Sequence, residues 1–438
     1  MTKPKSVPNP VLRVMSLADF RLVFTGTSLS LLGDQFALIA TPWLVLQLTG
    51  DPMLLGIVLA LEGFPRAAFM LIGGAITDRF SPRNMMLAAD AIRLVLVGLM
   101  AFAVLTGTIE IWMLYVFSLG FGLVAGFAIP AQNSIVPMLV DKDQLQAGNS
   151  MIMGATQLAG FVGPSLAGIV IGMYANTLHG VGYAYAIDAA SFAVSALCLV
   201  MIRGAGPVKG ERSPVSEEGI FAAIRSAWGH VWGDEALRLV FVLLAAINFL
   251  LIGPLLVGIP LIANSRLPEG AAAFGMLMSS FSVGNLFGFI AAGALPRPGG
   301  ATVKTLLVAL LFAFSAVVGG LGYIPSTALD CLLLALLGLG NGYIAILLFT
   351  WMQANTPRAM LGRVMSFLMF ANTGLVPLSQ AISGAIGKWD LDVLFLGAGA
   401  AAALVTIWAM LRPELGTFAQ SLAAQAEPGS GARGCRVA

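Results

Sequence analysis

The sequence predicts an all-helical membrane protein of twelve transmembrane helices in two pseudo-symmetric six-helix bundles. Composition is the first reason: 58% of the 438 residues are hydrophobic and 10% are charged, against about 25% charged residues in a soluble domain. The second is that apolar residues gather in stretches of about twenty, the length of a helix that crosses a bilayer. The third is one long polar loop that divides these stretches six and six, as in membrane proteins built from two related halves.

Twelve apolar stretches are long enough to span a membrane. An even number of spans places both chain ends on the same side. The expected spans are residues 22–48, 53–76, 85–105, 111–129, 147–173, 181–202, 239–263, 272–295, 303–323, 329–351, 364–387 and 393–411.

The distribution of Lys and Arg predicts the orientation of these spans. With both termini in the cytoplasm, nineteen of the 23 basic residues fall in cytoplasmic segments, and two, Arg266 and Lys388, fall in outside loops. Cytoplasmic loops carry this kind of excess in membrane proteins. We therefore expect a multi-pass protein with both termini cytoplasmic, and the Ala- and Gly-rich composition suits a bacterial inner membrane.

The long loop and the C-terminal end complete the predicted domain organisation. We expect an N-terminal bundle, a cytoplasmic linker with an amphipathic helix, a C-terminal bundle and a disordered cytoplasmic tail, at residues 1–202, 203–237, 238–412 and 413–438. The tail is predicted to be disordered because most of its residues are small or polar and because Pro and Gly interrupt it.

The second part of the linker has apolar residues at helical spacing. These residues are Phe221, Ile224, Trp228, Val231 and Trp232. The pattern predicts an amphipathic helix, which either lies along the cytoplasmic membrane surface or packs on the cytoplasmic ends of the spans. The sequence leaves both interpretations open.

Several classes of function are disfavoured by composition. The net charge is only +2 and no basic domain is present, so a nucleic acid partner is not expected. Cys198, Cys331 and Cys435 lie far apart and match no metal or redox spacing. The two histidines, His179 and His230, lie in predicted loops on opposite sides of the membrane. We therefore expect no catalytic site, no metal site, no cofactor and no ATP-binding loop.

The short loop between the second and third spans, residues 74–84, carries a charged motif, GAITDRFSPRN. It resembles the motif of the major facilitator superfamily between the second and third helices, and the matching residues are Gly74, Asp78, Arg79 and Arg83. It departs at Ser81, where the family usually has glycine, and at Asn84, where a basic residue is usual. The resemblance implies the major facilitator fold, with alternating access around a central cavity. It also implies gating contacts of the acid and first arginine at the cytoplasmic face.

A second motif lies in the fifth span, which reads QLAGFVGPSLAG. Its core of Gly163, Pro164 and Gly168 is similar to the glycine-proline motif of the superfamily's exporters, with Ala167 where another glycine is frequent. A proline within a span removes a hydrogen bond and bends the helix. Two further segments resemble the branch of siderophore and macrolide exporters, AIPAQNSIVPMLV after the fourth span and MLGRVMS before the eleventh. Together with the glycine-proline motif, they favour export over import.

Six charged residues lie within spans of the N-terminal half. They are Asp34, Glu62, Arg66, Asp90, Arg93 and Asp188. Each costs roughly 2.5 to 3.5 kcal/mol at the centre of a span, so each needs a partner, water or a role. We therefore take these six residues as the candidate proton-coupling and cavity residues.

The spacing of the charges distinguishes pairs from single residues. Glu62 is four residues from Arg66, and Asp90 is three from Arg93, so each pair can neutralise itself within one helix. Asp34 has no basic residue within a turn of its own span. It must take a partner from another helix or hold a proton, which a carboxyl group in a poorly solvated cavity binds more tightly. Asp188 is either a shallow residue in contact with outside water or part of a gate.

The C-terminal half carries amides in place of these charges. They are Asn248, Asn285, Asn341, Asn372 and Gln380. Gly284 and Gly288 have the spacing that lets membrane helices approach closely, which indicates packing. A cavity charged on one wall, and apolar, aromatic and amide-lined on the other, suits a bulky amphipathic organic solute.

These patterns favour a transporter that exports an amphipathic small molecule, drug-like or siderophore-like, by proton antiport. Nutrient uptake or lysolipid movement by the same fold is the first alternative, and a membrane-embedded enzyme or a non-transporting sensor is a remote one. The expected partners are the small-molecule substrate, protons and membrane lipids. We expect the protein to be a monomer.

Overall fold

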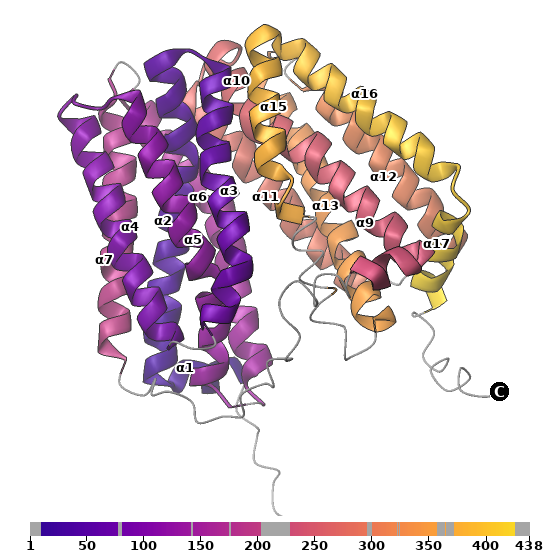
Figure 1. Cartoon of the computed structure of the whole chain (residues 1–438), viewed down its shortest axis with the longest axis horizontal. Coiled ribbons are helices and arrows are strands. Elements are labelled where there is room, and N and C mark those ends of the chain that lie inside the picture. The colour runs from indigo at the N-terminus through magenta and orange to yellow at the C-terminus, as the bar shows by residue number, and fades with distance from the viewer. Residues whose placement is uncertain are drawn as a thin grey trace, which may run out of the picture. The chain divides into compact units, whose positions relative to one another are not determined.

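The computed structural model describes residues 10–77, 81–141, 143–174, 177–202, 228–295, 300–321, 323, 325–356, 364 and 372–424. Every regular element in these ranges is a helix (Figure 1). The predicted all-helical fold class is confirmed. The linker at 203–227, Asp78 and Arg79 of the loop motif, and the tail at 425–438 lie outside the described residues.

Eleven helical stretches in the described part of the chain are long and apolar enough to cross a membrane. They correspond to predicted spans one to ten and twelve. The predicted eleventh span is described at residue 364 and again from residue 372, and it contains α15 (Val376–Trp389). The seventh span is made of three consecutive elements, α9 (Glu235–Ile247), the π-helix η1 (Asn248–Ile252) and α10 (Gly253–Ser265).

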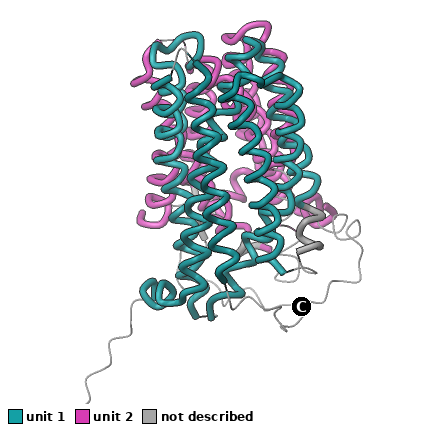
Figure 2. Tube along the Cα trace, turned by 90° about the vertical axis from the view of Figure 1, so that its left-hand side faces the viewer, with its two compact units in different colours: residues 1–211, 263–279 teal, residues 212–262, 280–438 magenta. Residues whose placement is uncertain are grey.

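The chain divides into two compact units (Figure 2). Unit 1 contains residues 1–211 and 263–279, and unit 2 contains residues 212–262 and 280–438. The segment 263–279 thus groups with the N-terminal half. The sequence-based domain boundaries at residues 202 and 238 stay predictions.

Among the described residues, unit 1 is built on seven helices of the N-terminal half. They are α1 (Pro10–Ser16), α2 (Ala18–Thr49), α3 (Pro52–Thr77), α4 (Pro82–Leu105), α5 (Ile111–Leu139), α6 (Leu145–Gly172) and α7 (His179–Met201). Within the unit, α2 packs against α6 and α7, α3 packs against α5, and α4 packs against α5 and α7. This packing brings α2, α4 and α7 together around the charged residues described below.

Local sequence sets the ends of these helices. Proline begins both α3 and α4, at Pro52 and Pro82, where its missing N–H is not needed and its φ already fits a helix. At the end of α2, Gly50 adopts the left-handed conformation with φ +62° and donates its N–H to the carbonyl of Leu46. Glycine makes this turn at no steric cost.

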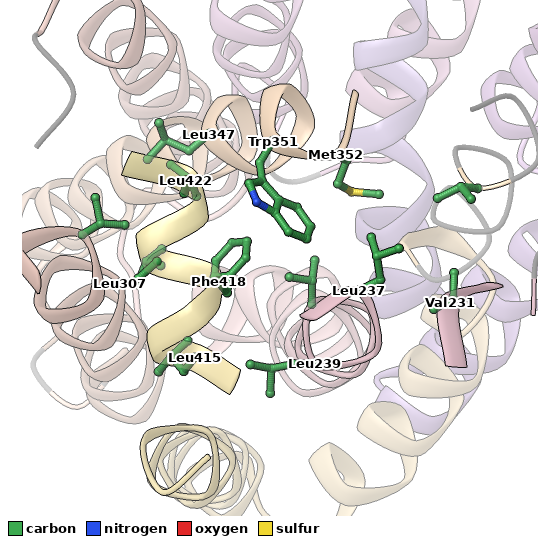
Figure 3. Packing of buried hydrophobic residues seen from close by; sticks show 14 residues of the cluster. Val231, Leu237, Leu239, Leu307, Leu347, Trp351, Met352, Leu415, Phe418 and Leu422 are labelled. Carbon is green, nitrogen blue, oxygen red and sulfur yellow. The ribbon is translucent and has the colours of Figure 1, made fainter. Parts of the chain in front are cut away.

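Unit 2 contains α9, η1, most of α10, and further helices of the C-terminal half. The other helices are the second part of α11 (Ala271–Ala294), α12 (Gly300–Gly320), α13 (Thr327–Asn355), α15, α16 (Leu391–Met410) and α17 (Glu414–Ala424). Here α12 packs against α16 and α17, and α17 also contacts α9. Buried residues from α9, α12, α13 and α17 form one apolar cluster (Figure 3).

The helix α17 corrects the prediction of a disordered tail. Residues 414–424 are helical, and Leu415, Phe418, Ala419 and Leu422 are buried in the apolar cluster of unit 2. These four residues recur every three or four positions, so one face of the helix is apolar. The prediction failed because the polar and small residues between them dominate the composition of the tail.

The helical turn at residues 228–233 bears on the predicted amphipathic helix. Val231 is buried in the apolar cluster of unit 2. Trp232 stacks on Trp228 with ring centroids 4.0 Å apart, and it also contacts Phe241 edge-on. The described part of this helix therefore packs on the ends of the spans, which is the second of the two interpretations that the sequence left open.

Gly284 and Gly288 lie where α11 and α13 approach closely, as predicted. A Cβ at Gly284 would meet the backbone carbonyl oxygen of Ala335, and a Cβ at Gly288 would meet that of Leu339. Backbone atoms cannot rotate away as a flexible side chain can. The predicted packing role is therefore confirmed.

Gly284→Val is expected to destabilise the protein by about 1–3 kcal/mol, because overpacking forces backbone shifts. The matched control is Gly293→Val on the same helix, where a Cβ meets nothing within 4 Å. Thermal unfolding of the purified protein in detergent measures the difference. Equal midpoints for the two variants would contradict the close approach of α11 and α13.

Candidate functional site

Four helices of unit 1 carry the six charged residues predicted from the sequence. Asp34 lies on α2, Glu62 and Arg66 lie on α3, Asp90 and Arg93 lie on α4, and Asp188 lies on α7. Each pair of charges on one helix is separated by three or four residues and so shares a helix face. What the structure adds is the set of contacts between helices.

Arg93 is at the centre of the electrostatic interactions among these charges. Its side chain is buried, with the residue 5% exposed, and it interacts electrostatically with Asp34, Asp90 and Asp188. The guanidinium also lies over the rings of Phe121 and Phe192, 5.1 and 5.5 Å from their centroids. Its Nε–H donates to no partner among the described residues. One arginine therefore serves as counter-charge to acids from three helices, with two aromatic faces supporting it.

Asp90 is held in a defined position by a hydrogen bond. The hydroxyl of Ser195 on α7 donates to its Oδ2 at 2.6 Å, and both residues are buried. A buried carboxylate without such a donor would be costly. The sequence suggested that Asp90 pairs with Arg93 alone, whereas the structure shows a hydrogen bond to α7 and an Arg93 shared with other acids.

Asp188 is fully buried, at 0% exposure. Neither of its carboxylate oxygens has a hydrogen-bond partner in the described part of the chain. The Ser191 hydroxyl lies beside it but donates to the backbone carbonyl of Asp188 at 2.7 Å. The interpretation of Asp188 as a shallow residue in contact with outside water is therefore wrong. Its carboxyl group belongs to the charged cluster.

Asp34 reaches the same cluster from α2. Its carboxylate interacts electrostatically with Arg93, Glu62 and Arg66, and its Oδ1 is buried without a hydrogen-bond partner among the described residues. The sequence left two possibilities for Asp34, a partner from another helix, such as Arg66, or a bound proton. The structure brings Arg93 to Asp34 as well.

Glu62 and Arg66 form the predicted ion pair along α3. Arg66 Nη1 lies 3.2 Å from Glu62 Oε1, and the two side chains are 40% and 25% exposed. This pair is more accessible than the buried Asp90, Arg93 and Asp188. Close approach of α5 supports α3 here, because Gly122 lies against the backbone carbonyl of Glu62.

Sequence reasoning missed the residues that support the charges. Ser195, Phe121 and Phe192 carry no charge and therefore gave no signal of their own. For Ser195 a signal existed, since it follows Asp188 by seven residues and so lies on the same face of α7 two turns later. The aromatic faces around Arg93 could not be found without the packing of α4, α5 and α7.

The structure describes only part of the motif at residues 74–84. Arg83, near the start of α4, donates from Nε to the carbonyl of Leu199 at 2.7 Å and from Nη2 to that of Val200 at 3.0 Å. Carbonyls in the last turn of a helix lack helical partners. Arg83 thus ties the start of α4 to the end of α7. Gly74 lies within α3, while Asp78 and Arg79 lie outside the described residues, so their gating role stays a prediction.

The Gly163, Pro164 and Gly168 motif lies inside α6, which runs as one helix from Leu145 to Gly172. A Cβ at Gly163 would meet the side chain of Gln35 on α2 at 2.5 Å. A Cβ at Gly168 would meet Gly275 Cα of the segment 263–279 at 3.0 Å. These glycines therefore make room for neighbouring segments of unit 1, and a proline-induced kink stays a prediction.

Unit 2 contains a cavity of about 410 Å³. In the described part of the chain its lining comes from α9, η1, α10, α11, α12, α13 and α17, together with Asn372, and these lining side chains are all uncharged. Its polar side chains are Asn248, Asn341 and Asn372, three of the five predicted amides. Asn285 and Gln380 are not among its lining residues.

Two of these amide side chains form a hydrogen bond with each other at a π-helical turn. Asn248 Nδ2 donates to Asn372 Oδ1 and to the carbonyl of Leu244, both at 2.8 Å. Asn248 is also the first residue of the π-helix η1. Single π-turns inside long helices are frequent at functional sites. In the described residues, no group of three His, Cys, Asp or Glu side chains has the geometry of a metal site.

A comparison with known protein families shows to which family the chain belongs. The sequence profile of the Major Facilitator Superfamily matches residues 23–379. The chain belongs to the major facilitator superfamily. It is therefore a multi-pass membrane transporter of the kind that moves small molecules, as the motif of residues 74–84 and the helical fold had indicated.

Similar proteins of this superfamily include exporters. The chain is 25% identical over 388 residues to the enterobactin exporter EntS of Citrobacter koseri, covering 84% of this chain and 85% of that protein. It is 24% identical over 388 residues to EntS of Shigella boydii, with the same coverage of 84% and 85%.

Solved structures of other superfamily members share the fold. The POT family transporter PepTSo matches with a TM-score of 0.70 at 16% identity, covering 93% of this chain and 99% of that chain. The nucleoside transporter NupG matches with a TM-score of 0.63 at 15% identity, covering 92% and 98%. At these identities the likeness concerns the fold alone.

Proposed function

We propose that this superfamily member exports an amphipathic, siderophore-like small molecule in exchange for protons, by alternating access. The buried charge cluster of unit 1 carries the proposal. It combines four carboxyl groups with two guanidinium groups, so full ionisation leaves excess negative charge in a poorly solvated interior. Burying unpaired charge is costly, and binding protons removes the excess. A transporter can use such protons only if they are exchanged with water on both sides.

The proposed substrate class is supported from two directions. Relatives that align over 84% of this chain are named as enterobactin exporters. The cavity of unit 2 is apolar with a few amides, which suits aromatic and hydrocarbon groups with hydrogen-bonding substituents better than a small ion. Both observations favour a bulky organic solute.

Protons supply sufficient energy for this function. One elementary charge moving through 100 mV releases about 2.3 kcal/mol. Because 1.4 kcal/mol corresponds to a factor of ten, this energy sustains roughly a fiftyfold gradient of a neutral solute. In the proposed orientation both termini are in the cytoplasm and protons enter from outside, across a bacterial inner membrane.

Proteoliposomes with an imposed pH gradient test the proposal. A proton antiporter of either orientation accumulates its substrate in an acidic lumen, whereas a proton symporter accumulates it in an alkaline lumen. With enterobactin as the probe, we expect accumulation in the acidic lumen, abolished by a protonophore and absent from protein-free liposomes. Accumulation in the alkaline lumen would show uptake by symport, and no dependence on the pH gradient would refute proton coupling.

A further inference from the structure

The cavity of unit 2 has the size and lining of a binding site. A cavity of about 150 Å³ lined by Leu, Ile and Phe is large enough to bind benzene. The cavity here, at about 410 Å³, falls within the range of small-molecule sites, about 300–1,000 Å³. It has room for a group of two or three rings or for a branched hydrocarbon.

The lining determines the chemistry of the occupant. Among the described residues that line this cavity none is charged, and its aliphatic side chains are joined by Phe281, Phe314, Phe349 and Phe418. A charged group would lose its hydration here without a counter-charge. The amides at Asn248, Asn341 and Asn372 can donate and accept hydrogen bonds. The cavity therefore fits an uncharged aromatic or hydrocarbon group with a hydrogen-bonding substituent.

The C-terminal helix α17 forms part of the cavity wall. Leu415 and Phe418 of α17 line the cavity. Phe418 packs edge-on against Trp351 of α13 with ring centroids 4.7 Å apart (Figure 3). Trp351 Nε1 donates to Ser421 Oγ at 2.8 Å. A helix of 11 residues is marginal in water without packing. Its place in the wall therefore depends on these contacts with α13 and the apolar cluster.

We propose that this cavity binds the uncharged aromatic or hydrocarbon part of the transported molecule and that α17 closes one side of it. The cavity lies within unit 2. Its size, its lining and the position of α17 in its wall are observed in this structure. That the occupant is part of the transported molecule rests on the proposed function. The existence of the binding site does not depend on that function.

Photolabelling with benzophenone, an uncharged two-ring ketone, tests the site. The full chain in detergent is irradiated with benzophenone, and the labelled peptides are identified by mass spectrometry. We expect labels on cavity-lining residues of α13 and α17. Ala345→Trp fills the cavity from α13 and should lower this labelling at least tenfold, with Ala345→Leu giving a smaller decrease. Leu336→Trp, on the same helix at an exposed residue outside the cavity lining, should leave it unchanged.

Two outcomes would overturn the proposal, the first by removing the site and the second by replacing its occupant. One is equal labelling of α13 and α17 in the Ala345 variants and in the Leu336 control, with all proteins eluting as single species. The other is tenfold loss of the label on adding phosphatidylethanolamine, which would identify a lipid acyl chain as the occupant.

Transport separates this proposal from the proposed function. In pH-driven transport, Ala345→Trp should raise KM at least tenfold while Leu336→Trp leaves it unchanged. Specific labelling combined with unchanged KM in Ala345→Trp would overturn the assignment of the occupant to the transported molecule. Absence of pH-driven transport by the unaltered protein would refute the proposed function, and labelling would still decide whether the cavity binds an uncharged aromatic group.

Discussion

Arg93→Met is expected to lower the free energy of unfolding by about 3–5 kcal/mol, the cost of removing one partner from a buried ionic group. Arg93 is the counter-charge that Asp34, Asp90 and Asp188 share. Methionine keeps most of the side-chain volume and removes the charge. Asp188 would then be a buried acid facing other acids, with neither carboxylate oxygen bonded within the described part of the chain. Thermal and denaturant unfolding in detergent measure the loss.

Two comparisons give this prediction its specificity. Arg66→Met removes a guanidinium that is 40% exposed and paired on its own helix, so its cost should stay within about 1 kcal/mol. Adding Asp188→Asn to Arg93→Met should recover part of the stability, because it removes one of the uncompensated acids. A double-mutant cycle between these positions measures the coupling. Equal losses for Arg93→Met and Arg66→Met would show that Arg93 is not the shared counter-charge.

Asp34→Asn is expected to abolish pH-driven accumulation of substrate. Asparagine has nearly the same shape but binds no proton. We propose that Asp34 takes a proton from outside and releases it inside, while Glu62 and Arg66 adjust the proton affinity of Asp34. Without this exchange, accumulation should fall from roughly fiftyfold at a driving force of 100 mV to equal concentrations. Transport assays in proteoliposomes with an imposed pH gradient measure it.

The same assay without a gradient provides the control. Asp34→Asn should still exchange labelled for unlabelled substrate, because exchange needs alternating access but no net proton movement. Asp34→Glu should retain part of the accumulation, since it keeps a titratable carboxyl group at that position. If Asp34→Asn accumulates substrate as well as the unaltered protein, then another acid of the cluster carries the coupling proton. Asp188, fully buried, is the next position to replace.

The charged cluster of unit 1 was predictable only in part. All six charged residues were identified in the sequence because a charge within an apolar span is conspicuous by itself. The Glu62–Arg66 pair followed from spacing on one helix, and the 3.2 Å contact agrees with it. Partners on different helices, such as Ser195 for Asp90, depend on how α4 and α7 pack, which spacing along one helix does not determine.

The amides of unit 2 show the same limit. Their presence in apolar spans predicted a polar lining, and Asn248, Asn341 and Asn372 do line one cavity. The sequence could not separate them from Asn285 and Gln380. It also gave no sign that α17 reaches the cavity, because the burial of Leu415 and Phe418 depends on contacts with α9, α12 and α13.

By itself the sequence determined the all-helical class, the positions of the spans in the described part of the chain, and the set of charges that need an explanation. These are local properties, since the length of an apolar stretch and the cost of a charge within it do not depend on the rest of the fold. Only the tertiary structure decided that Arg93 serves three acids, that Asp188 is buried among them, and that α17 packs into unit 2. Each of these depends on residues far apart in the chain, whose contacts arise when the helices pack.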